Sequence, residues 1–190
     1  MRVQVRAVRP AEMRRLEQAE VSSGLERGQT PSVHLEKAWH GLHFLLTGSA
    51  GESGVPLGFL LEGGQEVGED DGYGAPRLFQ PGEVQQINAA LAPISDDELW
   101  GRFDPELMEA EGIYPGIWDE GEEEMRDEYL TCFHELKKVV ALAGEGGDGP
   151  AGDAQLRSGR RYHPADRKGP GSGVASRRKR WIFVDGVGRQ

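Results

Sequence analysis

The chain has 190 residues, a formal net charge of −10 and a single cysteine, Cys132. This length corresponds to one domain, which can bury a stable core without disulfides or metals. One cysteine excludes an intrachain disulfide framework. The N-terminus has no apolar signal segment, and no apolar run approaches the ~20 residues that span a bilayer, so we expect a soluble, cytoplasmic protein.

The charge is divided unevenly along the chain. Residues 1–143 contain 12 Lys and Arg against 27 Asp and Glu, whereas residues 144–190 contain 10 against 5. The acidic part disfavours nucleic acid and favours a basic partner. The basic part is too poor in apolar residues to offset its ordering entropy. We therefore predict a domain at residues 1–147 and a largely disordered basic tail at residues 148–190.

Two interpretations of this tail stay open. Its one strand-like segment, Trp181–Val184, is either the last strand of the domain, displaced by an insertion, or part of a non-homologous end that begins near Gly149. The abrupt reversal of charge favours the second interpretation. The basic run Arg177–Arg180 would suit nucleic acid or a membrane surface, but a disordered tail explains it more simply.

The N-terminal half predicts two strands and two helices. Residues 3–7 alternate apolar and polar side chains, as in a half-buried strand, and Pro10 suits the first turn of a following helix. The next helix has Ser32 as its N-cap and Gly48 just after its end. Its apolar stripe comprises Leu35, Ala38, Trp39, Leu42, Leu45 and Leu46. The apolar run 56–61 predicts a short strand.

The C-terminal half of the acidic part is helical. Pro81 begins a helix that reaches residue 91, and Ser95 with Glu98 forms a capping box for the next one. Asp104-Pro105 begins a further helix, and a long amphipathic helix covers residues 120–143. The chain is therefore predicted to be α+β, a compact single domain of about five helices and a few short strands.

Three potential ligands are spaced for one helical face. Glu36, His40 and His43 stand at i, i+4 and i+7 and are weak candidates for a metal site. The segment lacks the H-E-x-x-H pattern of zinc proteases. A packing helix with a polar face beside the Trp39 stripe explains the same residues. Both interpretations stay open, and we expect no cofactor.

Two loops carry further candidates for a binding site. Residues 69–74 combine the carboxylates Asp70 and Asp71 with Tyr73 between two glycines. This loop lacks the alternating acid spacing of a calcium-binding EF-hand, so a solvated turn is the simpler interpretation. Tyr114 and Trp118 belong to a second, aromatic loop that either covers the edge of the core or lines a pocket.

Four segments resemble a known family. They are LEKAWHGLHFLLTG, PLGFLLEGGQEVGEDDGYGAPRLF, ISDDELWGRFDPELM and IYPGIW. Together they resemble the YfbM-like family, a bacterial domain family of unknown function, over residues 1–143. The resemblance implies a compact cytosolic α+β domain and no agreed reaction. It also implies that Trp39, His40, His43 and the two loops belong to the family's pattern.

Two hypotheses for function follow. The first is a binding or interaction protein, for example an immunity-like inhibitor of a basic toxin, with one polar-aromatic cleft. That cleft comprises Trp39, His40, His43, Asp70, Asp71, Tyr73, Tyr114 and Trp118. The alternative is a hydrolase in which His40 or His43 acts as general base and Asp70 or Asp71 orients it. A histidine bonded to a carboxylate at a pocket would favour the alternative.

Overall fold

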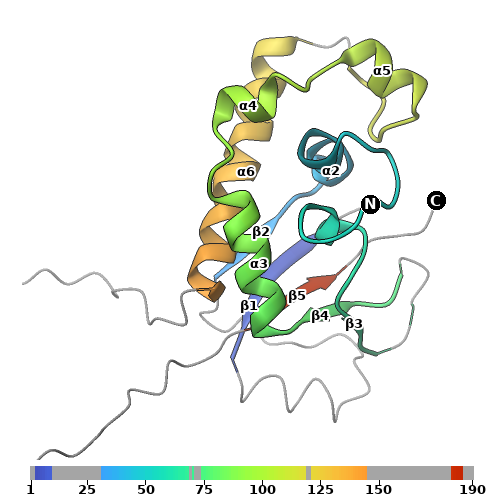
Figure 1. Cartoon of the computed structure of the whole chain (residues 1–190). Helices are drawn as coiled ribbons and strands as arrows, with labels where there is room; N and C mark the ends of the chain where they lie inside the picture. Colours follow the sequence, from blue (N-terminus) through green and yellow to red (C-terminus); the bar gives the residue numbers. More distant parts are fainter. Residues whose placement is uncertain are drawn as a thin grey trace, which may run out of the picture.

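Strands from both ends of the chain meet in one sheet in the computed structural model, which describes residues 3–9, 31–68, 70, 74–118, 121–144 and 181–185 (Figure 1). The strands are β1 (Gln4–Val8), β2 (Ser32–His34), β3 (Gln65–Glu66), β4 (Arg77–Phe79) and β5 (Trp181–Asp185). Their order is β2-β1-β5-β4-β3, and every neighbouring pair is antiparallel. The short strands β2 and β3 form the two edges, where little backbone is left unpaired.

Strand β5 corrects the predicted domain boundary. It lies at the centre of the sheet, between β1 and β4. Its residues Ile182 and Val184 face Ala7 and Val5 across the β1 ladder, and all four side chains are buried. A domain at 1–147 with a tail at 148–190 therefore leaves out a central strand, and residues 181–185 belong to the fold. The rest of the predicted tail lies outside the described residues.

The described residues also form five α-helices and one 3-10 helix. They are α2 (Trp39–Thr47), the 3-10 helix η1 (Leu57–Leu60), α3 (Pro81–Leu91), α4 (Asp96–Trp100), α5 (Pro105–Ala110) and α6 (Glu122–Gly144). Helix α6 packs against β1, β2 and β5, and α3 packs against both α6 and β5. In the described residues, five α-helices and a five-stranded antiparallel sheet confirm the predicted α+β class.

The predicted helix ends agree with the structure where a local capping bond defines them. Gly48 ends α2 at φ 74°, the left-handed conformation that glycine adopts at low cost. The Ser95 hydroxyl accepts a bond from the Glu98 N–H at 3.1 Å, and the Asp104 carboxylate accepts one from the Leu107 N–H at 3.0 Å. The predicted helix after Pro10 lies outside the described residues.

Two predicted elements are wrong, because tertiary contacts determine the secondary structure of these segments. The apolar run 56–61 forms the 3-10 helix η1 instead of a strand, since a short buried run has no periodicity that separates the two. Ser32 does not cap a helix. It lies in β2, where Val33 pairs with Val5, and α2 begins only at Trp39.

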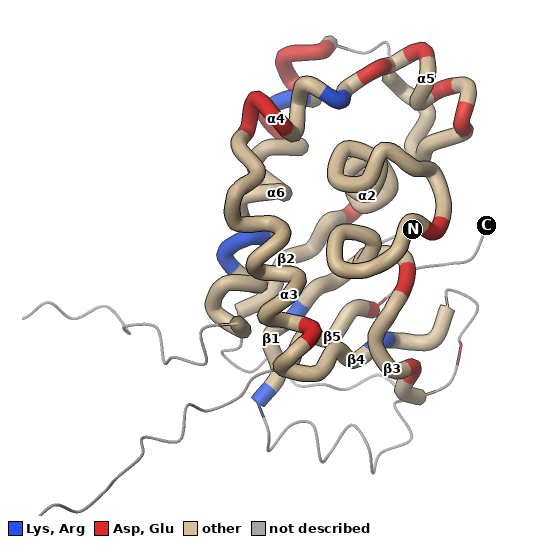
Figure 2. The backbone as a smooth tube through the Cα atoms, viewed as in Figure 1, with Lys and Arg blue, Asp and Glu red and all other residues tan. Residues whose placement is uncertain are grey.

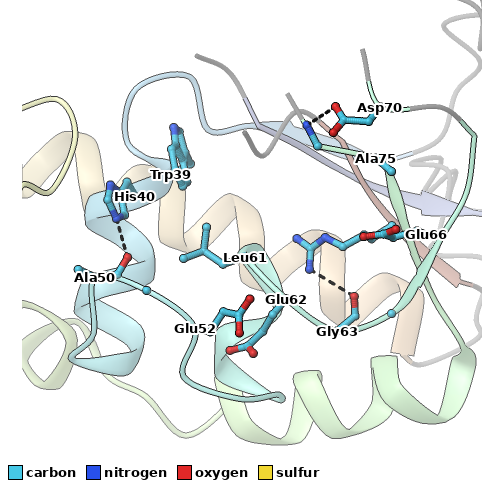
Figure 3. Close-up of a pocket in the computed structure, with 14 residues that line it drawn as sticks. Trp39, His40, Ala50, Glu52, Leu61, Glu62, Gly63, Glu66, Asp70 and Ala75 are labelled. Atoms are coloured by element: carbon cyan, nitrogen blue, oxygen red, sulfur yellow. Dashed lines mark hydrogen bonds between the residues drawn. The ribbon is translucent and has the colours of Figure 1, made fainter. Parts of the chain in front are cut away.

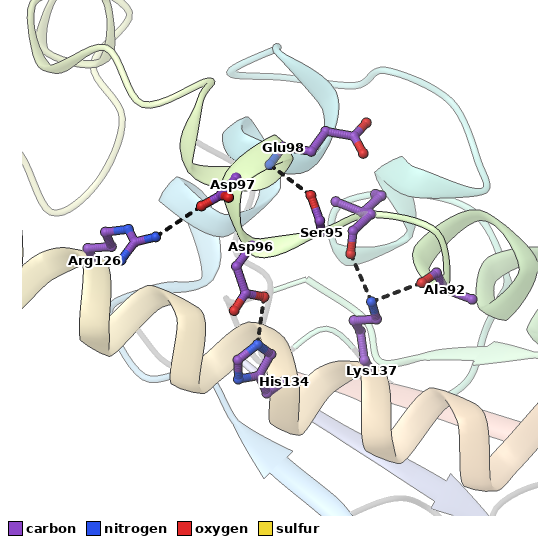
Figure 4. A network of polar contacts seen from close by, with 9 residues as sticks. Ala92, Ser95, Asp96, Asp97, Glu98, Arg126, His134 and Lys137 are labelled. Carbon is purple, nitrogen blue, oxygen red and sulfur yellow. Dashed lines mark hydrogen bonds and ion pairs between the residues drawn. The ribbon is translucent and has the colours of Figure 1, made fainter.

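Polar bonds fasten the turn between α3 and α4 onto α6 (Figure 4). Asp96 accepts a bond from His134 at 2.7 Å, and Asp97 pairs with Arg126 at 3.3 Å. The Lys137 ammonium donates to two backbone carbonyls just beyond α3. Figure 2 shows Asp and Glu gathered over α4, α5 and the start of α6, so this end of the molecule is its acidic end.

Candidate functional site

A pocket of about 740 Å³ opens beside the first turn of α2 (Figure 3). Trp39 and His40 form one wall, and residues 50–52 follow from the loop after α2. The other walls come from residues 61–64, Glu66, Asp70, residues 74–75 and Arg77. The pocket therefore exists only because α2, the end of η1 and the start of β4 converge. Its volume is in the range of small-molecule sites, about 300–1,000 Å³.

His40 is held in one neutral tautomer at this pocket. Its Nδ1 accepts a bond from the Tyr114 backbone N–H at 3.0 Å, and its Nε2–H donates to the Ala50 carbonyl at 2.8 Å. A backbone N–H only donates and a carbonyl only accepts, so the ring carries its proton on Nε2. The ring also stacks on Trp39 at 4.8 Å. Burial lowers the pKa of His40, which favours the neutral form.

His43 lies deeper and is fully buried. Its Nε2 lies 2.9 Å from the Gly51 carbonyl oxygen, which accepts the bond, and 3.4 Å from the Thr47 hydroxyl. Its Nδ1 has no hydrogen-bond partner among the described residues. Burial lowers the pKa of His43, and the bond to Gly51 opposes that shift. The two histidines therefore fasten the loop after α2 to the helix.

These bonds do not support the metal and hydrolase interpretations. A shared helical face needs Glu36 on the helix, but α2 begins three residues later and Glu36 has φ 42°. The described residues contain no group of three metal-ligating side chains. His40 and His43 each bond a backbone carbonyl, and neither bonds a carboxylate in the described part of the chain. Neither imidazole is arranged as a general base.

The remaining predicted residues separate into three groups. Asp70 lines the pocket and accepts a bond from the Gly74 N–H at 2.8 Å. Tyr114 stacks on Trp39 at 6.5 Å behind the pocket wall, and Trp118 is buried and donates its indole N–H to the Ile113 carbonyl. Asp71 and Tyr73 lie outside the described residues.

Arg77, the cation among the described residues that line the pocket, was not predicted from the sequence. Arg77 is only 7% exposed, and its guanidinium donates to the Leu60 carbonyl at 2.6 Å and to the Gly63 carbonyl at 3.3 Å. Burial lowers its pKa to about 10, against the attraction of Glu62 and Glu66. The arginine therefore stays charged at neutral pH. A cation beside the buried residues Leu78 and Phe79 of β4 was the only available signal.

Carboxylates outnumber cations around the pocket. Among the described residues, Glu52, Glu62, Glu66 and Asp70 line it together with one cation, Arg77, and the neutral His40. One Glu62 oxygen accepts the backbone N–H groups of Ser53 and Gly54, so this carboxylate also holds the loop before η1. Figure 3 shows Glu52 and Glu62 on one side of the pocket and Asp70 across it. The described residues that line the pocket therefore include more acidic than basic side chains.

Comparison with known proteins assigns the fold family. A family model described as a domain of unknown function, DUF1877, matches residues 2–149. The chain belongs to the DUF1877 family. The crystal structure of YfbM from Escherichia coli, a protein of unknown function, matches this DUF1877 chain with a TM-score of 0.56 and 21% identity over 75% of this chain and 90% of YfbM. This likeness shows the fold, and the family match together with it confirms the predicted YfbM-like family.

Three further findings concern the DUF1877 chain. No curated protein sequence shows significant similarity to it. Among its described residues, no helix combines the length and apolar character needed to cross a membrane. The family match ends before β5, so the central strand of the sheet lies outside the matched residues.

The buried histidines predict a loss of stability in acid. Because the folded-state pKa values of His40 and His43 lie below 6.5, the unfolded chain binds more protons below that pH. The free energy of unfolding should therefore be fully retained above about pH 6.5 and fall as the pH drops toward about 5. Urea unfolding curves across this range measure the change.

A matched pair of variants isolates the histidine contribution. The double variant His40→Gln/His43→Gln should show a smaller loss between neutral and acidic pH than the wild type. His134→Gln, which removes the exposed histidine of α6, should retain the loss. An unchanged pH dependence in the double variant would show that these two imidazoles do not control it.

Proposed function

We propose that this DUF1877 chain is a binding protein whose pocket accepts a positively charged group presented by a ligand or protein partner. The observation that carries the proposal is the excess of carboxylates over Arg77 around a pocket of about 740 Å³. Opposite charges across an interface steer association and set specificity. A basic partner, such as a toxin held by an immunity-like protein, fits this charge.

The side chains at the pocket support binding more than chemistry. Both nitrogens of His40 are engaged with the backbone, and its ring is stacked against Trp39. The carboxylates Glu52, Glu66 and Asp70 are exposed and can meet a ligand without being withdrawn from water first. The described residues thus provide exposed carboxylates beside a rigidly held aromatic wall. Among them, no side chain is positioned as a general base or a nucleophile.

A short arginine-rich peptide tests the proposal directly. Fluorescence anisotropy should show binding at low salt that weakens as salt is raised to about 0.2 M, because the charges on the rim are screened. Glu52→Gln/Glu66→Gln should weaken binding about two- to thirtyfold, since each of the two exposed ion pairs contributes about 0.2–1 kcal/mol.

The control removes two charges elsewhere. Glu106→Gln/Glu111→Gln changes exposed carboxylates at α5, at the acidic end and away from the pocket, and removes the same amount of negative charge. This variant should bind the peptide nearly as well as the wild type. Equal losses in both variants would mean that the whole acidic surface, and not the pocket, attracts the peptide.

A further inference from the structure

Arg77 is a buried cation that the proposed function does not use. It lies on β4 opposite Glu66 of β3 and Val184 of β5, and its side chain reaches the pocket. A charge removed from water is expensive unless a carboxylate or several hydrogen bonds compensate it. The partners of this guanidinium therefore show what else it can hold.

The hydrogen bonds of the guanidinium compensate its charge only in part. A guanidinium has five N–H donors. Those of Arg77 bond two neutral carbonyls, of Leu60 and Gly63, and no carboxylate of the described residues forms an ion pair with it. Glu62 and Glu66 attract it from a distance. An added carboxylate would supply the charge-assisted bonds that the neighbouring side chains do not.

The positions of the charges determine which end of a ligand would enter the pocket first. The cation Arg77 is buried in the wall, whereas Glu52, Glu66 and Asp70 are exposed around the opening. A doubly charged phosphate would be repelled by these carboxylates, but a ligand with one carboxylate and more than one positive group would be attracted overall. Its carboxylate would lie toward Arg77 and its positive groups toward the opening.

We infer that the pocket recognises a basic amino acid through its free α-carboxylate as well as through its positive charge. This inference rests on the proposed binding of a positive group and adds Arg77 as the residue that selects for the carboxylate. The basic residue is either a free amino acid or the C-terminal residue of a peptide, because both present the same groups.

Ligand pairs that differ only in the carboxylate test the inference on the unmodified protein. L-arginine should bind at least about tenfold more tightly than agmatine, which is arginine without its carboxylate, when both are titrated by calorimetry or followed in ¹H–¹⁵N spectra. The peptide Gly-Gly-Arg should likewise bind more tightly with a free C-terminus than with an amidated one. Tighter binding of the peptide than of L-arginine assigns the C-terminal source, and the reverse order assigns the free amino acid.

A matched pair of arginine variants tests whether Arg77 binds the carboxylate of the ligand. Arg77→Lys keeps the charge but loses the planar fork, so the preference for L-arginine over agmatine should fall toward one. Arg102→Lys is the control, because Arg102 also donates to two backbone carbonyls, of Leu45 and Leu46, outside this pocket. It should keep the preference. Circular dichroism verifies that both variants are folded.

The outcomes separate the inference from the proposed function. Equal binding of L-arginine and agmatine to the wild type would overturn the role of Arg77 and leave the binding of positive groups intact. Binding of neither ligand nor of the arginine-rich peptide would overturn both. A preference that survives in Arg77→Lys and disappears in Arg102→Lys would also overturn the assignment to Arg77.

Discussion

A chain truncated after Gly149 should lose the cooperative fold, although residues 2–149 contain the whole family match. Truncation removes β5, which pairs with β1 along its full length and with β4 over three residues. The pairs β2–β1 and β4–β3 would then be separate two-stranded ribbons, which are marginally stable in water. Burial of Ile182 and Val184, about 1.5–3 kcal/mol each, would also be lost. These losses are a large part of a typical total stability of about 5–15 kcal/mol.

Thermal denaturation followed by far-UV circular dichroism tests this prediction on three chains of different length. The full chain and a chain ending at Asp185 both contain β5 and should melt cooperatively. The chain ending at Gly149 should not. In the full chain, Ile182→Ala should lower the free energy of unfolding by about 2–5 kcal/mol, as expected for a fully buried aliphatic residue. A cooperative, unshifted transition in the short chain would place β5 outside the stable fold.

Gly41→Ala should destabilise the protein by about 1–3 kcal/mol, although alanine favours a helix over glycine by about 1 kcal/mol. Gly41 lies in α2 against the buried aromatic residues Trp118 and Tyr129. A Cβ at this position would lie 2.5 Å from the Tyr129 hydroxyl oxygen and 2.7 Å from Trp118 Cη2. The helix would have to move away from α6. Urea unfolding gives the change in free energy.

Two variants control this prediction. Gly82→Ala adds the same methyl group to α3, where a Cβ meets nothing within 4 Å, and should be neutral or stabilising. Tyr129→Phe removes a buried hydroxyl that has no partner in the described residues, so it should cost little and should offset part of the Gly41→Ala loss. If Gly41→Ala were as well tolerated as Gly82→Ala, α2 would not be packed this closely on α6.

Only some of the residues that line the pocket could be predicted from the sequence. Trp39, His40 and Asp70 were predicted for a common cleft, and all three line one pocket. His43 was predicted there too, but its side chain is fully buried and bonds the Gly51 carbonyl. Arg77 and the three pocket glutamates were missed. A single charged residue at the end of a short strand or in a loop has no periodic signature, and these residues become neighbours only when the chain folds.

The sequence by itself determined the elements whose signals are local. The alternation in β1, the stripe of α6 and the caps at Ser95 and Asp104 depend on neighbours a few residues away, and these predictions agree with the structure. Only the tertiary structure decided that residues 57–60 coil into η1 and that residues 181–185 enter the centre of the sheet. A short apolar segment takes its conformation from the partners that bury it, and those partners are distant in the chain. Arg77 and its carboxylate neighbours are likewise separated in the sequence, and only the folded chain places them around one pocket.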